Sequence, residues 1–200
     1  MKKEKPQNYH HGDLRSALIE AAVEMINKQG VEQVTMRGLS EWVGVSRTAA
    51  YRHFNDKVDL LTATAIEGFR QFSSALRTTR VDDSVEALIR FRNMGEAYIQ
   101  FAVTKPAYYR LMFGDVVMQD SDALLIASDE AFSELVMMLQ ILQQMALIKT
   151  EDLQMQATFV WSLMHGLASL LIDKKLTFEQ EEMAAFMGFL DQKISAALID

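Results

Sequence analysis

Apolar residues recur every three or four positions along most of this chain of 200 residues. The first such segment places Leu14, Ala17, Leu18, Ala21 and Ala22 on one face of a helix. Residues that interrupt helices are scarce, because the chain holds 9 Gly and only 2 Pro. So few turn-forming residues exclude a sandwich or barrel of many strands. The sequence therefore predicts an all-α fold of about nine helices.

Capping residues set the bounds of the predicted helices. Glycines at 30 and 44 end the first helix and a short helix over residues 36–43, and a second short helix is expected over 47–54. Pro106 suits the first turn of a short helix that ends at Gly114. A long helix is expected from about Asp122 to Ala146. The expected N-caps are Asp13, Thr35, Ser46, Asn55 or Asp56, Thr150, and Thr177 in a capping box with Gln180.

Residues 153–172 form a predicted helix of 20 residues without a charged side chain, which is long enough to cross a bilayer. Polar groups on all of its faces would be costly in lipid, so we expect a helix buried in protein. These groups are Gln154, Gln156, Thr158, Ser162, His165 and Ser169. The basic N-terminus has no apolar segment after it, which argues against a signal peptide. We therefore expect a cytoplasmic protein that does not enter the membrane.

Two short helices joined at Gly44 follow a longer helix, which is the order of a helix-turn-helix over about residues 35–54. The exposed side of the second short helix would carry only uncharged or basic groups, which fit the major groove of DNA. These residues are Arg47, Thr48, Tyr51, Arg52 and His53. Short helix pairs are common in all-helical proteins, so the spacing alone leaves DNA binding and ordinary packing equally open.

The distribution of charge separates the two ends of the chain. Residues 1–57 carry 9 basic and 7 acidic groups, a net charge of +2, whereas residues 58–200 carry 11 and 20, a net charge of -9. A locally basic head on an acidic body is the electrostatic pattern of a DNA-binding domain joined to another domain. We therefore expect a DNA-binding domain over 1–57 and a helical effector-binding and dimerisation domain over 58–200.

Several segments resemble a known family. Residues 9–15 (YHHGDLR), 34–40 (VTMRGLS), 44–46 (GVS) and 50–57 (AYRHFNDK) resemble the N-terminal domain of TetR/AcrR-family transcriptional regulators. Residues 105–113 (KPAYYRLMF) and 161–168 (WSLMHGLA) look like the C-terminal domain of the WHG-type subgroup of that family. Ala49 and Ala50 depart from the family pattern, which often has Gly and a larger apolar residue there.

The resemblance implies a homodimer whose two heads bind a palindromic DNA operator, with recognition elements about 34 to 36 Å apart. It also implies that a small effector in the body changes the separation of the heads, and it favours a repressor. Lys57 lies in the first turn of a helix, whose amides favour an anion such as a phosphate. The DNA-contacting residues implied by position are Thr35, Arg37, Ser46, Arg47, Thr48, Tyr51, Arg52, His53 and Lys57.

Aromatic and methionine side chains are frequent in the body and indicate an adaptable apolar pocket. The candidate effector-binding residues are Phe91, Met94, Tyr98, Phe101, Tyr109, Phe113, Trp161 and His165. Plain core packing remains the alternative for each of them, and His165 is either a core histidine or a ligand anchor. The last two helices carry more apolar surface than one chain can cover, so we expect the homodimer to form through them.

No catalytic, metal or cofactor site is expected. The chain has 0 Cys, and its carboxylate pairs fall at helix starts, where the helix dipole accounts for them. His10 and His11 are adjacent and lack the spacing of metal ligands. The sequence therefore predicts that the protein is not an enzyme. Two alternatives stay open, namely a helical ligand-binding or adaptor protein with an unused head, and an activator that uses the same DNA contacts.

Overall fold

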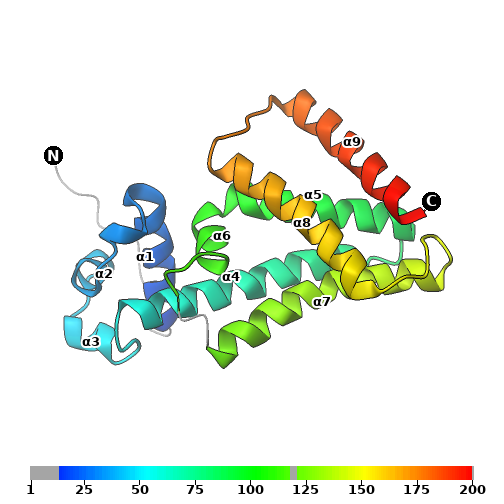
Figure 1. The fold of residues 1–200 in the computed structure, drawn as a ribbon. Coiled ribbons are helices and arrows are strands. Elements are labelled where there is room, and N and C mark those ends of the chain that lie inside the picture. Colours follow the sequence, from blue (N-terminus) through cyan, green and yellow to red (C-terminus); the bar gives the residue numbers. More distant parts are fainter. Residues whose placement is uncertain (1–13, 118–120, 200) are drawn as a thin grey trace.

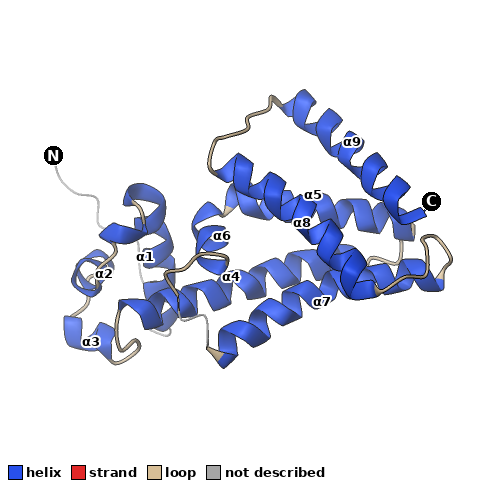
Figure 2. Cartoon of the chain, viewed as in Figure 1, coloured by secondary structure: helices blue, strands red, loops and turns tan. Residues whose placement is uncertain are grey.

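The computed structural model describes residues 14–117 and 121–199, and no strand occurs in these two ranges (Figure 2). The all-α prediction is confirmed, with nine α-helices and one short 3-10 helix in the described chain. Their bounds are α1 Leu14–Gln29, η1 Val31–Gln33, α2 Met36–Val43, α3 Arg47–Tyr51, α4 Lys57–Arg80, α5 Ala87–Thr104, α6 Pro106–Met112, α7 Asp122–Gln144, α8 Leu153–Ile172 and α9 Gln180–Ile199.

Three of the predicted N-caps are confirmed. The side chains of Thr35, Ser46 and Asp56 each accept a hydrogen bond from the backbone amide three residues further on. Gly30 and Gly44 follow α1 and α2 at φ of 86° and 79°, where a side chain would be strained. Asp13, the expected cap of α1, lies outside the described residues.

Two predicted caps were wrong. Helix α8 is capped by Asp152, whose Oδ1 accepts from the backbone amide of Met155 at 2.9 Å, and not by Thr150. At the start of α9 the carboxylate of Glu182 accepts from the backbone amide of Glu179 at 3.0 Å, in place of the expected box at Thr177. In both cases a carboxylate displaced the expected hydroxyl, because a negative charge is favoured at a helix N-terminus.

Three helix ends also differ from the expectation. Helix α3 ends at Tyr51 and not at Phe54, because residues 52–54 turn so that the Phe54 ring enters the core. Helix α6 ends at Met112 and α7 at Gln144, each two residues before the predicted end.

Helices α1 to α3 form a head at one end of the molecule, and α4 runs from this head along the body (Figure 1). Leu60 and Leu61, near the start of α4, are buried close to the head, and Phe69, Phe72 and Leu76 are buried further along. Helix α4 packs against α1 and also against α5, α6 and α7. One continuous helix therefore joins the core of the head to that of the body.

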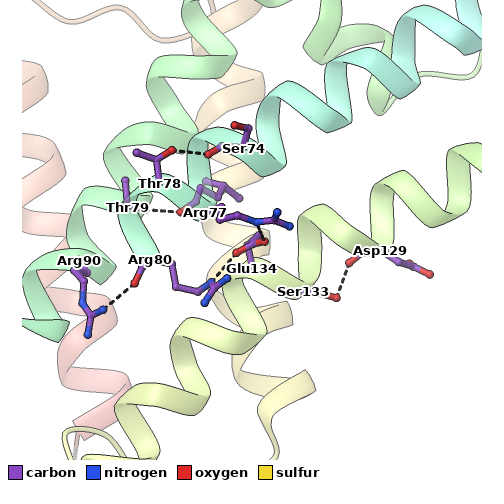
Figure 3. Close-up of polar contacts among 10 residues, drawn as sticks. Ser74, Arg77, Thr78, Thr79, Arg80, Arg90, Asp129, Ser133 and Glu134 are labelled. Atoms are coloured by element: carbon purple, nitrogen blue, oxygen red, sulfur yellow. Dashed lines mark hydrogen bonds and ion pairs between the residues drawn. The ribbon is translucent and has the colours of Figure 1, made fainter. Parts of the chain in front are cut away.

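A buried carboxylate holds the far end of α4 against α7. Glu134 of α7 is fully buried and accepts from Arg77 Nε at 2.8 Å and from Arg80 Nε at 2.6 Å, both on α4 (Figure 3). The backbone carbonyl of Arg80 accepts in turn from an Nη of Arg90 on α5 at 2.8 Å (Figure 3). We call Glu134, Arg77 and Arg80 the Glu134 clamp. It joins two long helices through charged hydrogen bonds at the end away from the head.

Helix α8 is the one described helix that is long and apolar enough to cross a membrane by length and composition, and 33% of its apolar window is buried in the chain. Core helices of soluble proteins meet the same criteria. Ala157, Val160 and Met164 form a buried stripe on this helix. A second stripe faces outward, with Met155 73% and Phe159 42% exposed.

Candidate nucleic-acid interface and ligand cavity

The outward side of α3 and of the turn after it carries five polar residues, which we call the α3 face. All five are exposed, and they are Arg47, Thr48, Tyr51, Arg52 and His53. Ala50 on the inner side is completely buried, and Phe54 anchors the turn in the core. The small side chain at position 50 therefore lets α3 lie close to the head core. This packing directs the donors of the α3 face toward solvent, where a DNA groove can reach them.

Three predicted contact residues already have partners in the head. Thr35 and Ser46 cap α2 and α3 through their side-chain oxygens, which leaves their hydroxyl protons to donate to a phosphate. Arg37 Nε lies 2.9 Å from Glu41 Oε1, and this guanidinium lowers the pKa of the exposed Glu41 carboxyl. A phosphate at Arg37 must therefore compete with Glu41.

Lys57 stands at the start of α4, as expected, and its Nζ donates to the backbone carbonyl of Glu32 at 3.3 Å. The anion-binding role expected of this helix terminus is reduced. The backbone amide of Asp59 is already bonded to Asp56 Oδ1 at 2.8 Å, so a carboxylate occupies part of the site. Lys57 therefore offers a point charge to a phosphate, with less help from the helix than the sequence indicates.

A cavity of about 790 Å³ lies within the body, with walls from α4, α5, α7, α8 and α9. It is lined by five of the eight candidate effector residues, which are Phe91, Met94, Tyr98, Phe113 and Trp161. Phe101, Tyr109 and His165 are not in its wall. Sequence reasoning missed the lining residues Phe69, Phe72, Leu124, Phe132 and Met187. Only their helical spacing marked them, and that spacing indicates burial without telling a cavity wall from a core.

Tyr98 connects the cavity wall to a polar cluster behind it. Its hydroxyl lies 2.9 Å from that of Tyr109, which lies 2.7 Å from His165 Nδ1. Burial raises the pKa of Tyr98 to about 12 and that of Tyr109 further, while burial lowers the pKa of His165. Both phenols are therefore protonated at neutral pH and the imidazole is neutral. The contact is a hydrogen bond in either neutral tautomer, since Tyr109 donates to an unprotonated Nδ1 and accepts from a protonated one.

The cluster predicts a dependence of stability on pH. Because the folded-state pKa of His165 lies below its unfolded value of about 6.5, the unfolded chain binds the proton more readily. The stability due to neutral His165 is complete above about pH 6.5 and is lost as pH falls through the lower folded-state pKa. We expect urea denaturation to show a smaller decrease between pH 7 and 5 in His165→Gln than in the native chain. Equal decreases would contradict this origin.

No group of three or more His, Asp or Glu suited to a metal ion occurs in residues 14–117 and 121–199. The geometry instead combines a helix-turn-helix that carries exposed polar donors with a helical body that contains an aromatic cavity. This combination defines a DNA-binding transcriptional regulator with a ligand-binding domain.

Comparison with known proteins identifies the family. The family model described as "Bacterial regulatory proteins, tetR family" matches residues 18–64, and the one described as "Tetracyclin repressor-like, C-terminal domain" matches residues 91–192. The second match covers half of the chain, and the chain belongs to the TetR family of bacterial regulatory proteins. Family and fold point to a regulator and not to an enzyme.

Curated relatives include nucleoid occlusion factors named SlmA. The factor from Photobacterium profundum is 30% identical over 126 residues, which cover 60% of this chain and 62% of the relative. That from Alteromonas mediterranea is 27% identical over 155 residues, which cover 75% and 77%. The match therefore spans about three fifths of the length of the first relative.

Solved structures share the whole fold. A Rhodococcus sp. RHA1 protein of unknown function has a TM-score of 0.84 at 26% identity, covering 98% of this chain and 100% of that one. The fatty acid degradation regulator FadR from Bacillus halodurans has a TM-score of 0.73 at 14% identity, covering 94% and 97%. The second likeness shows the fold alone.

Proposed function

We propose that the protein is a cytoplasmic homodimeric repressor that binds a palindromic DNA operator and leaves it when a small apolar effector fills the cavity. In this proposal residues 1–57 contact DNA, and residues 58–200 bind the effector and form the dimer. The observation that carries the DNA-binding role is the α3 face, whose exposed residues include two arginines and no acid. The contacts are direct donation to base edges and phosphates.

The exposed stripe of α8 supports a dimer through α8 and α9. Met155, Phe159, Leu163 and Leu170 are 73%, 42%, 38% and 47% exposed, although all are large and apolar. A Cβ added to Gly166 in the same stripe would meet no atom within 4 Å, so a second helix can approach closely there. On α9, Phe189 is 53% exposed. A second copy packed on this surface would bury these side chains.

Helix α4 supports the coupling of effector to DNA. Phe69, Phe72 and Leu76 of this helix line the cavity, while Leu60 and Leu61 at its other end are buried near the head. An effector in the cavity therefore contacts the same rigid helix that carries the head. Binding shifts the population toward a head separation that does not suit two successive major grooves, if the effector prefers that state.

Replacing both Tyr51 and Lys57 by alanine tests the DNA contacts. We expect the operator affinity of the dimer to fall about 100-fold. Each of its two heads loses one exposed phenol and one phosphate-binding cation, and this loss lowers the affinity about tenfold per head. Fluorescence anisotropy with a labelled operator measures the change. Lys28→Ala, which removes one head charge outside the α3 face, is the control and should change affinity little. Unchanged affinity of the double variant would refute the assignment.

The operator for this measurement comes from selection of bound fragments of the source genome. A repressor should select a few palindromic sites beside promoters. The SlmA relatives favour a second candidate, a DNA-binding role over the nucleoid, for which the selected sites should be many and spread along the chromosome. If the affinity for every DNA fragment does not change with salt concentration, the result would instead support a ligand-binding protein with an unused head.

A further inference from the structure

Carboxylates outnumber cations in the wall of the cavity. The wall contains Glu96, Asp115, Asp129 and Asp191, against Arg92 as its single basic residue. Arg92 is already neutralised, because its Nη2 and Nε lie 2.8 and 3.0 Å from Asp191 Oδ2. No lysine or arginine in the described part of the chain forms an ion pair with the other three carboxylates. Among the described residues, these three negative charges of the wall therefore have no counter-ion.

The aromatic lining also favours a positively charged ligand. Seven phenylalanine, tyrosine and tryptophan side chains line the cavity, among them Phe72, Phe113 and Trp161. The faces of aromatic rings are electron-rich and attract cations, most strongly when the cation has lost its water. An anion gains nothing from these faces and is repelled by the carboxylates.

The positions of these groups suggest how such a ligand lies. The side chains of Glu96 on α5 and Asp129 on α7 are exposed parts of the cavity wall, whereas those of Phe72 and Met94 are buried. An ammonium group at the two carboxylates keeps part of its hydration, while an attached alkyl or aromatic body displaces water from the apolar interior.

We propose that the effector is a hydrophobic organic cation, an alkyl or aromatic amine, with its charged nitrogen near Glu96 and Asp129 and its apolar body between α4, α5, α7 and α8. This inference rests on the effector role proposed for the cavity and adds the chemical class. Long-chain carboxylates are disfavoured as effectors, because Arg92 is already paired with Asp191.

Three probes with the same ten-carbon chain test the sign of the charge, namely decyltrimethylammonium, decanol and decanoate, each used below its aggregation threshold. The chain has 2 Trp, so Trp42→Phe in the head leaves Trp161 of the cavity wall as the fluorescent reporter. We expect the cation to bind at least about tenfold more tightly than decanol, and decanoate more weakly than both. Equal affinities for the three probes, or no binding, would overturn the proposal.

Replacing Glu96 and Asp129 by their neutral amides tests where the charged nitrogen of the ligand binds. In Glu96→Gln with Asp129→Asn we expect the affinity for decyltrimethylammonium to fall about tenfold, because each exposed carboxylate contributes a few-fold. The affinity for decanol should stay the same. Glu130→Gln is the control, because Glu130 is an exposed acid of α7 outside the cavity wall. An equal loss for decanol, or an equal loss in the control, would contradict the placement.

Operator release separates this inference from the proposed function. Anisotropy of the native protein on its operator is measured with all three probes at one concentration, which is just sufficient to saturate the cavity with decyltrimethylammonium. Release of the operator by decyltrimethylammonium alone supports a cationic effector. Release by decanol or decanoate instead overturns the chemical class while the effector-responsive regulator stands. Failure of the protein to bind any selected operator without a probe overturns the proposed function itself.

Discussion

Replacing Glu134 by leucine is expected to lower the free energy of unfolding by about 3 kcal/mol, which corresponds to more than a hundredfold change in the folding equilibrium. The buried carboxylate is the shared partner of Arg77 and Arg80, and the side chain of Arg80 is only 17% exposed (Figure 3). Without Glu134, Arg80 keeps its charge but loses its partner in a place with little water. Arg77, whose side chain is 58% exposed, can return to solvent, so its loss costs less. Urea denaturation at one fixed protein concentration measures the change.

A second substitution distinguishes a charge left without a partner from a packing defect. In Glu134→Leu with Arg80→Met the stranded charge is gone, and we expect most of the lost stability to return. Glu130→Gln, on the exposed side of the same helix, should change the free energy of unfolding by less than about 0.5 kcal/mol. A loss of less than about 1 kcal/mol in Glu134→Leu would show that the clamp contributes little to the body.

Affinity for the operator is expected to fall about 10³-fold between 50 and 200 mM salt. On the α3 face and at the start of α4, each head presents three basic side chains without a carboxylate partner among the described residues, which are Arg47, Arg52 and Lys57. Two heads then neutralise about six phosphates, and the slope of log affinity against log salt is about -5. Arg37 is not counted among these phosphate contacts, because its Nε is paired with Glu41 Oε1 at 2.9 Å. A titration series at four salt concentrations measures the slope.

The slope also reports the number of heads on DNA. Arg52→Ala should make it less steep by about two, because both copies of the dimer lose one contact. Lys28→Ala should leave it unchanged, since Lys28 lies 3.6 Å from Glu24 and outside the α3 face. A native slope near -3 would show that one head binds alone and would contradict the symmetric dimer.

Much of the head could be predicted from the sequence, because its signals are local. Thr35, Ser46 and Gly44 set helix ends through bonds within four residues, and such bonds depend little on the rest of the chain. The errors at Thr150 and Thr177 are of the same local kind, since a carboxylate nearby was the better acceptor.

The cavity could be predicted only in part. Aromatic residues of α5 and α8 were recognised, but Phe69 and Met187 reach the same wall from helices far apart in the sequence. Helical spacing shows that a side chain is buried and does not show what it faces. The polar cluster of Tyr98, Tyr109 and His165 likewise depends on how α5, α6 and α8 cross.

The sequence by itself determined an all-helical chain with a helix-turn-helix head, because helical periodicity, caps and scarce helix breakers act over a few residues. Tertiary structure alone decided which groups meet. It brought Glu134 to the two arginines of α4 and Arg92 to Asp191, and it left three carboxylates of the cavity wall without a counter-ion among the described residues. The physical reason is distance. Electrostatic interactions depend on how far apart two groups lie in space and how deeply they are buried. For groups as remote in the chain as Arg92 and Asp191, only the packing of the helices sets that distance.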